Sequence, residues 1–274
     1  MRNNRLTSAF SMLELIFVII ILGIVASIGA EIIAKVYEQY IIQRAEHRAT
    51  LKTELAATQI ANRLASAVPG TVYRIRKTTN AYETIDSDLT TDGDNYKGIQ
   101  WVASDTDSFN AAATPGWSAF CDINTSSQTS IETPGSALNT TTTIITNLSG
   151  TAPAAGSLSL YFPYDLTEYN ATIADADTIT LTGAGASHIV EQYKLAWTSY
   201  ALVVDETDNN LYLYYNFAPT PQLLYTNGTR SLLMKNISTF KFKGAGHTIR
   251  FKVCKEERIS EDVNITACKE KAVF

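Results

Sequence analysis

The N-terminal stretch FSMLELIFVIIILGIVASIGA, residues 10–30, decides how the chain is organised. Its 21 residues contain one charged side chain, Glu14, and as a helix they span roughly 31 Å, which matches a bilayer hydrocarbon core of about 30 Å. Residues 1–9 carry Arg2 and Arg5 and no acidic residue. The positive-inside rule therefore places residues 1–9 in the cytoplasm and the bulk of the chain outside the inner membrane.

The composition of the whole chain excludes several classes of protein. Its 274 residues are 18% charged and 45% hydrophobic, which is typical of globular domains rather than fibrous or disordered chains. The net charge of −5 gives no basic footprint, so no nucleic-acid partner is expected. The three histidines are far apart and the three cysteines lack the CxxC spacing of a zinc site, so we expect no metal centre.

Two other interpretations of residues 10–30 stay open. A cleaved secretory signal has the same basic start and apolar run, but this run is long and Val25-Ala26-Ser27 is a poor cleavage site. A plain membrane anchor needs no carboxylate, and inserting Glu14 into a bilayer costs on the order of 3 kcal/mol. That cost makes Glu14 a candidate functional residue.

The segment SAFSMLEL, residues 8–15, resembles the prepilin processing motif of type IV pilins and type II secretion pseudopilins. The motif consists of a short basic leader, a small residue, a phenylalanine that becomes the new N-terminus, a glutamate four residues later, and an apolar helix. The resemblance implies that a prepilin peptidase cleaves between Ala9 and Phe10 and that the Phe10 amine is then methylated. The family usually has glycine where this chain has Ala9, which is still small enough for a tight cleavage site.

The resemblance also gives Glu14 a role as a subunit-docking carboxylate. In the family, a membrane-buried carboxylate pairs with the free N-terminal amine of a neighbouring subunit. Both charges are costly in lipid alone, and each offsets the desolvation of the other when subunits stack. The implied partners are prepilin peptidase, other minor and major pilins or pseudopilins, the inner-membrane assembly platform and membrane lipid.

The helix is predicted to continue beyond the membrane over residues 31–68, because this segment contains no proline and Pro69-Gly70 is a strong stop signal. We interpret its second half as packed on a globular domain and its first half as exposed to fibre neighbours. By 100° steps the apolar residues fall on two adjacent faces, one with Ile33, Tyr37, Tyr40, Ile41, Leu51 and Leu55, the other with Ala56, Ile60, Leu64 and Ala67.

Residues 69–274 are predicted to form a β-rich domain. Alternating apolar and polar residues indicate a strand at 71–76 and two hairpins, at 199–217 and 237–253. In the second hairpin the aromatic and aliphatic residues point to one face, and the lysines and Arg250 point to the other. This pattern is typical of a sheet with one solvent-exposed face. The Ala-, Ser- and Thr-rich stretch at about 103–158 is predicted to be a surface excursion with a few short strands. The predicted class is α+β, a type IV pilin-like helix on an antiparallel sheet.

Two further segments, residues 55–71 and 232–242, are similar to the large minor subunits of the family, namely the J-type minor pseudopilin of type II secretion and the W-type minor pilin of type IV pili. The 265 residues left after removal of the leader also point to a minor subunit. The resemblance implies a structural subunit, not an enzyme, that helps to start fibre assembly at the tip. It would cross the inner membrane once, hold its domain in the periplasm, and join a periplasmic or surface fibre.

Two other functions are weighed against this one. The first is a surface-binding tip subunit, adhesin-like or active in DNA uptake, whose excursion at 103–158 contacts a ligand. The second is a membrane-anchored periplasmic enzyme, for which no residue pattern argues and for which we expect no cofactor. The glycine-rich Gly183–Ser187, the aspartates between residues 86 and 94, and His188 are interpreted as a turn, a solvated loop and an isolated surface histidine rather than as phosphate, calcium or catalytic sites.

The cysteines allow one disulfide in an oxidising periplasm. Cys254 alternates with Val253 and is predicted to point to the lysine-bearing face of the last hairpin. Cys268 follows 14 residues later in a charged segment, so a Cys254–Cys268 bond would clamp the C-terminal tail across the sheet. Cys121 beside Phe120 fits a buried free thiol. A disulfide through Cys121 is the alternative pairing.

Overall fold

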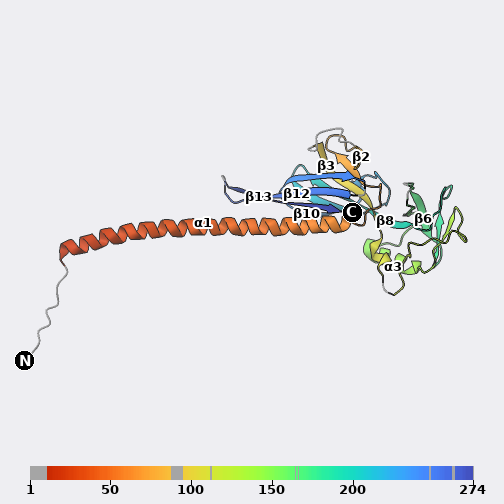
Figure 1. The fold of residues 1–274 in the computed structure, drawn as a ribbon, viewed down its shortest axis with the longest axis horizontal. Helices are drawn as coiled ribbons and strands as arrows, with labels where there is room; N and C mark the ends of the chain where they lie inside the picture. Colours follow the sequence, from red (N-terminus) through yellow and green to blue (C-terminus); the bar gives the residue numbers. More distant parts are fainter. Residues whose placement is uncertain are drawn as a thin grey trace, which may run out of the picture.

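A computed structural model of the chain describes residues 11–87, 95–111, 113–163, 165, 167–246, 248–260 and 263–273. A long apolar N-terminal helix packs on an antiparallel β domain, which confirms the predicted α+β class (Figure 1). The elements in chain order are α1 (Met12–Leu64), β1 (Tyr73–Arg76), β2 (Tyr82–Thr84), β3 (Tyr96–Ser104), α2 (Thr106–Phe109), β4 (Ser130–Glu132), α3 (Leu138–Ser149), β5 (Leu158–Tyr161), β6 (Tyr169–Ile173), β7 (Thr178–Leu181), β8 (Lys194–Asp205), β9 (Asn210–Phe217), η2 (Tyr225–Asn227), β10 (Thr229–Met234), β11 (Ile237–Ala245), β12 (Thr248–Arg258) and β13 (Asn264–Val273).

Helix α1 begins and ends for identifiable reasons. The Ser11 hydroxyl accepts a hydrogen bond from the Glu14 backbone N–H and so caps the first turn. The helix ends at Leu64, earlier than the predicted end at residue 68, because the next residues hydrogen-bond to β3 instead: the N–H of Ser104 donates to Ser66 and the N–H of Val68 donates to Val102. The 53 residues of α1 span about 80 Å, and most of this length extends beyond the β domain (Figure 1).

The strands form two antiparallel sheets. The larger sheet has ten strands in the order β2-β1-β3-β8-β5-β6-β7-β4, with β9 paired to β8 and β10 paired to β9. The smaller sheet has the order β11-β12-β13. Strand β8 is long enough to pair with β5 near its start and with β9 further along, so it joins two lobes of the domain. The predicted hairpins correspond to the β8–β9 and β11–β12 pairs.

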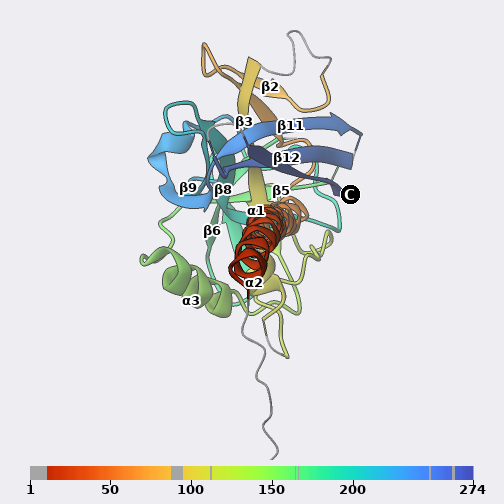
Figure 2. The same cartoon turned by 90° about the vertical axis from the view of Figure 1, so that its left-hand side faces the viewer.

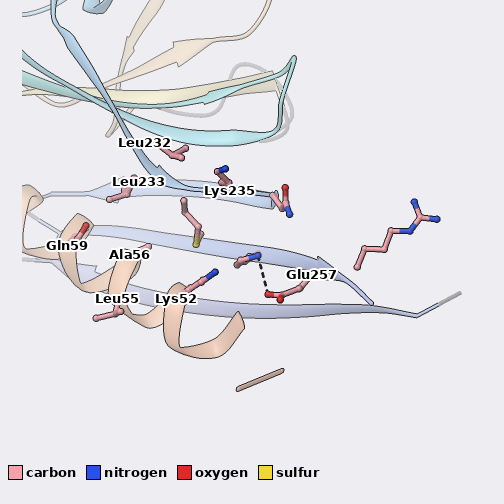
Figure 3. A pocket seen from close by; sticks show the side chains of 12 residues that line it. Lys52, Leu55, Ala56, Gln59, Leu232, Leu233, Lys235 and Glu257 are labelled. Carbon is pink, nitrogen blue, oxygen red and sulfur yellow. Dashed lines mark ion pairs between the residues drawn. The ribbon is translucent and has the colours of Figure 1, made fainter. Parts of the chain in front are cut away.

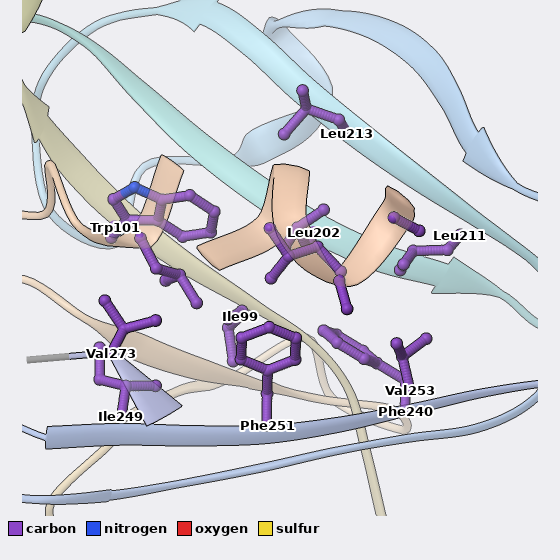
Figure 4. Packing of buried hydrophobic residues seen from close by; sticks show 14 of the residues in the cluster. Ile99, Trp101, Leu202, Leu211, Leu213, Phe240, Ile249, Phe251, Val253 and Val273 are labelled. Carbon is purple, nitrogen blue, oxygen red and sulfur yellow. The ribbon is translucent and has the colours of Figure 1, made fainter. Parts of the chain in front are cut away.

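The first lobe is a sandwich whose core lies between the two sheets and the second half of α1. Figure 4 shows Trp101 on β3 and Leu202 on β8 facing Phe251 and Val253 on β12. Ile60 and its neighbours on α1 belong to the same buried cluster. Figure 2, which looks along α1, shows β11 and β12 lying across one side of the helix. The helix therefore covers one edge of the sandwich.

The second lobe corrects the prediction for residues 103–158. We predicted a surface excursion with a few short strands, but this segment contains the twelve-residue helix α3 and supplies buried side chains to a second core, including Trp117 and Ile131. Threonines are poor helix formers. Here Leu138 and Ile145 are buried against the sheet, and Gly150 ends the helix with a left-handed φ of 83°. Tertiary burial thus overrides the local preference.

Candidate functional site: the exposed half of α1 and the groove beside its packed half

Glu14 lies in the first turn of α1 and is exposed. Within the part of the chain that the structure describes, its side chain has no ion-pair partner. Ala9 and Phe10, the predicted cleavage and methylation residues, lie outside the described residues, as does the leader. The structure therefore places the candidate docking carboxylate at the start of the helix but does not place the amine that it would pair with.

The first half of α1 exposes large apolar side chains along its whole length. They are between 41% and 85% exposed and comprise Met12, Leu13, Leu15, Ile16, Phe17, Val18, Ile19, Ile20, Ile21, Leu22, Ile24, Val25, Ile28, Ile32, Ile33, Val36, Tyr37, Tyr40 and Ile41. The apolar window of α1 has the length and composition of a membrane span, and none of it is buried inside the protein. This is consistent with single-pass anchoring in a membrane. The exposed Glu31–Lys35 ion pair, 2.7 Å between Oε1 and Nζ, follows the apolar stretch.

The second half of α1 is packed on the β domain through a different set of residues. The buried positions are mostly small, namely Ala45, Ala49, Thr53, Ala56, Ala57, Ile60 and Leu64. Leu51 and Leu55, which share the predicted face with Tyr37 and Tyr40, are 50% and 63% exposed. The packed face is thus the one that contains Ile60 and Leu64, and Leu51 and Leu55 remain largely exposed beside it.

Ion pairs fasten the second half of α1 to β13. The Glu54 carboxylate lies 2.6 Å from Lys269 Nζ and 3.1 Å from Lys271 Nζ, and Lys271 Nζ also donates to the Thr58 hydroxyl. Hydrogen bonds from Lys269 and then Lys271 lower the pKa of Glu54 below its ordinary value. Nearer the apolar half of the helix, Arg48 lies 3.0 Å from Glu257. Helix and sheet are therefore held together by charges as well as by packing.

The structure joins Cys254 to Cys268, the pairing that the sequence analysis favoured. The two residues lie directly opposite each other on β12 and β13, with 4.1 Å between their Cα atoms. Val253 is buried on the other face of β12, so the disulfide lies on the outer face, which also carries Lys252. Cys121 is a buried free cysteine, and burial raises the pKa of its thiol. A raised thiol pKa makes Cys121 a poor nucleophile.

A groove of about 580 Å³ lies between α1 and the β domain (Figure 3). Lys52, Leu55, Ala56 and Gln59 line it from α1, and the opposite wall comes from β10 and the residues that follow it. The end of β12 closes the third side. The sequence analysis missed this groove. The only local signal is the apolar run 232–234 followed by Lys235.

The other candidate sites from the sequence have ordinary surroundings. His188 is exposed, and its Nδ1 lies 3.2 Å from the hydroxyl of its neighbour Ser187. Gly183 and Gly185 adopt positive φ in a turn. Of the aspartates considered for calcium, Asp86 is exposed, and the others lie outside the described residues. Over the described ranges, no group of three or more metal-ligating side chains comes together.

One buried carboxyl was not anticipated from the sequence. Asp105 is only 3% exposed, and its Oδ1 accepts a hydrogen bond from the Ser108 N–H at the start of α2. Burial raises the pKa of Asp105, opposed by the hydrogen bonds from Ser108. Its backbone carbonyl accepts from the indole N–H of Trp117, so Asp105 holds α2 against the second core. These contacts give it a structural role.

Comparison with known proteins gives no assignment: no protein-family model, no curated protein and no solved structure matches the chain.

Proposed function

We propose that the chain is a minor pilin or pseudopilin, a structural subunit that joins a type II secretion pseudopilus or type IV pilus after processing by prepilin peptidase. The observation that carries the proposal is the division of α1. Its apolar stretch up to Ala30 is unpacked and contains a single carboxylate, Glu14, whereas its second half is packed on a β domain. A helix of this kind anchors the subunit in the membrane before assembly and packs against neighbouring subunits afterwards.

The proposed cycle follows from the cost of charge in lipid. The subunit waits in the inner membrane with residues 1–9 in the cytoplasm and the β domain in the periplasm. Cleavage at Ala9–Phe10 creates a new amine, and Glu14 pairs with the amine of a neighbouring subunit. Two charges that are costly to bury separately then offset each other, so that the pair sets the register between subunits. The assembly platform and the other minor and major subunits are the proposed partners.

Mass spectrometry of the protein from its native membrane tests the processing step. We expect the mature chain to begin at N-methylated Phe10. A chain that keeps Met1 would contradict processing, and a chain that begins after residue 27 would identify residues 10–27 as part of a secretory signal.

Substitution of Glu14 tests the docking step. Glu14→Val is expected to leave membrane insertion and the β domain intact, because an apolar residue suits a lipid-facing helix. Incorporation into sheared fibres should fall, and Glu14→Gln should show the same loss because it also lacks the charge. Glu14→Asp keeps the charge and serves as the matched control, with assembly retained in part. Normal assembly of the valine variant would remove the ion pair from the proposal.

A further inference from the structure

Strand β10 lies at the edge of the larger sheet and forms one wall of the groove beside α1. It pairs with β9 along one side, and over the described residues its other side has no strand partner. In an edge strand every second residue turns its N–H and C=O groups away from the sheet, where they can pair with another extended chain. Leu232 on this strand is 44% exposed and Leu233 is partly buried.

Apolar residues line two opposite walls of the groove, and the two walls come from elements that are distant in sequence. Leu232 and Leu233 on β10 line the groove on one side, and Leu55 on α1 lines it on the other (Figure 3). Leu55 is 63% exposed although it lies in the packed half of the helix. Side chains of an added strand would therefore find apolar contacts on both walls.

The charged residues of the groove are mostly cationic. Its lining includes three lysines and one arginine but only one carboxylate, Glu257. That carboxylate is already shared by Arg48 at 3.0 Å and Lys255 at 3.4 Å. Lys52 and Lys235 are exposed and have no carboxylate partner among the residues that the structure describes. The groove thus has positive charge left to complement an acidic ligand.

We propose that this groove binds an extended acidic segment of a partner protein, which adds as a strand to the free edge of β10. Main-chain hydrogen bonds to β10 supply affinity, and alternate aliphatic side chains pack on Leu55 and Leu232. Carboxylates on the segment lie near Lys52 and Lys235. This inference rests on the groove alone and is independent of the proposed role in fibres.

The position of the groove favours a protein over lipid as its occupant. The helix rises roughly 33 Å from Ala30, the end of the apolar stretch, to Lys52. Where the apolar stretch spans a membrane, the phosphates of its lipids therefore lie too far from Lys52 to contact it. Three residues of β10, Leu232 to Met234, line the groove, and the whole six-residue strand spans roughly 20 Å. An added strand of that length would lie partly in the groove and partly along the free edge beyond it.

Peptide binding to the full chain in detergent micelles tests the proposal, with fluorescence anisotropy as the readout. The probe is a labelled peptide of alternating glutamate and valine with the same length as β10, six residues. We expect it to bind, and we expect the peptide of alternating lysine and valine not to bind. N-methylation of alternate amides blocks one hydrogen-bonding edge of the probe. Methylation of the amides that face β10 should abolish binding, and methylation of the amides that face away from β10 should preserve it.

The charge requirement is tested with two double variants that change the net charge equally. Lys52→Glu with Lys235→Glu should weaken binding about tenfold, since each removed attraction becomes a repulsion. Lys243→Glu with Lys252→Glu, on the outer face of the small sheet, is the matched control and should bind the probe like the wild type. The N-methylated peptides need no protein variant, so that arm holds even where a substitution affects folding.

Several outcomes would overturn the proposal. Binding that ignores N-methylation rules out strand addition, and equal weakening by both double variants rules out the groove as the site. Self-association of the wild type that is lost in the Lys52→Glu/Lys235→Glu variant assigns the groove to a second copy of the chain. Capture of phosphatidylglycerol vesicles by the β domain, dependent on the same two lysines, assigns it to lipid headgroups.

Discussion

The two halves of α1 have similar backbone geometry and opposite environments. In the first half, bulky residues such as Ile20 and Leu22 are 53% and 65% exposed. In the second half, Ala49 and Ala57 are completely buried, although alanine has much less apolar surface to bury. Hydrophobicity alone therefore does not identify the half of the helix that packs on the domain.

Side-chain size explains the difference. Alanines at positions 45, 49, 56 and 57 let the helix approach β12 and β13 closely, and Ile60 and Leu64 fill the remaining space against the sandwich core. The large side chains of the first half meet no such surface in the part of the chain that the structure describes, and they remain exposed. One continuous helix thus combines a packing face for its own domain with an apolar surface for its environment.

The largest expected effect compares the same substitution in both halves. Ile60→Ala removes a side chain that is 1% exposed in the first core and should lower the free energy of unfolding of the β domain by about 3 kcal/mol. Ile20→Ala, at a residue that is 53% exposed, should leave it unchanged. Denaturant unfolding in micelles measures both, because all three tryptophans, at 101, 117 and 197, lie in the β domain. Equal effects would refute the division of the helix.

The disulfide tests the packed half of α1 through the sheet on which it lies. Because it closes a 14-residue separation between the two strands on which α1 packs, Cys254→Ala with Cys268→Ala should lower the free energy of unfolding by about 3 kcal/mol. Reduction of the wild type should have the same effect, and Cys121→Ser should not abolish the effect of reduction. A reductant effect that requires Cys121 would show that the pairing in solution is different.

Overpacking should cost somewhat less. Ala57→Leu pushes the helix away from the sheet, because no space surrounds this fully buried methyl group, and should destabilise the β domain by about 2 kcal/mol. Ala34→Leu makes the same change at an exposed position and is expected to be neutral for the domain. Thermal unfolding followed by tryptophan fluorescence distinguishes them. If the Ala57→Leu variant unfolds at the same temperature as the wild type, small residues do not set the helix–sheet distance.

The smallest effect concerns the ion pairs and depends on pH. Lys269 and Lys271 lower the pKa of Glu54 in the folded protein, so this carboxylate contributes stability above its ordinary pKa of 4.5. The contribution is lost as the pH falls through the folded pKa. Glu54→Gln should therefore be slightly less stable than the wild type at pH 7, with the difference closing below pH 4.5. Glu31→Gln, whose partner is Lys35 on the same helix, should show no such pH-dependent difference in the β domain.

Much of the candidate site follows from local sequence, and the rest does not. The position of Glu14 in an apolar stretch and the outward direction of Cys254 depend on periodicity and hydropathy, which are local properties. The Glu54–Lys269 ion pair and the Arg48–Glu257 ion pair join residues more than 200 positions apart, so no local pattern predicts them. Helical periodicity places Leu51 and Leu55 on a common apolar face with Tyr37, but it does not say which face of the helix packs on the domain.

The sequence by itself determined the long helix, its apolar half and the alternating strands of the β8–β9 and β11–β12 hairpins, because these depend on residues that are close together in the chain. Only the tertiary structure decided where α1 ends, since the Ser66 carbonyl and the Val68 N–H hydrogen-bond to β3. Burial turned the threonine-rich α3 into a helix of the second core. The groove likewise exists only because β10 ends the larger sheet next to a helix that ends 165 residues earlier in the sequence, and long-range packing of that kind has no local signal.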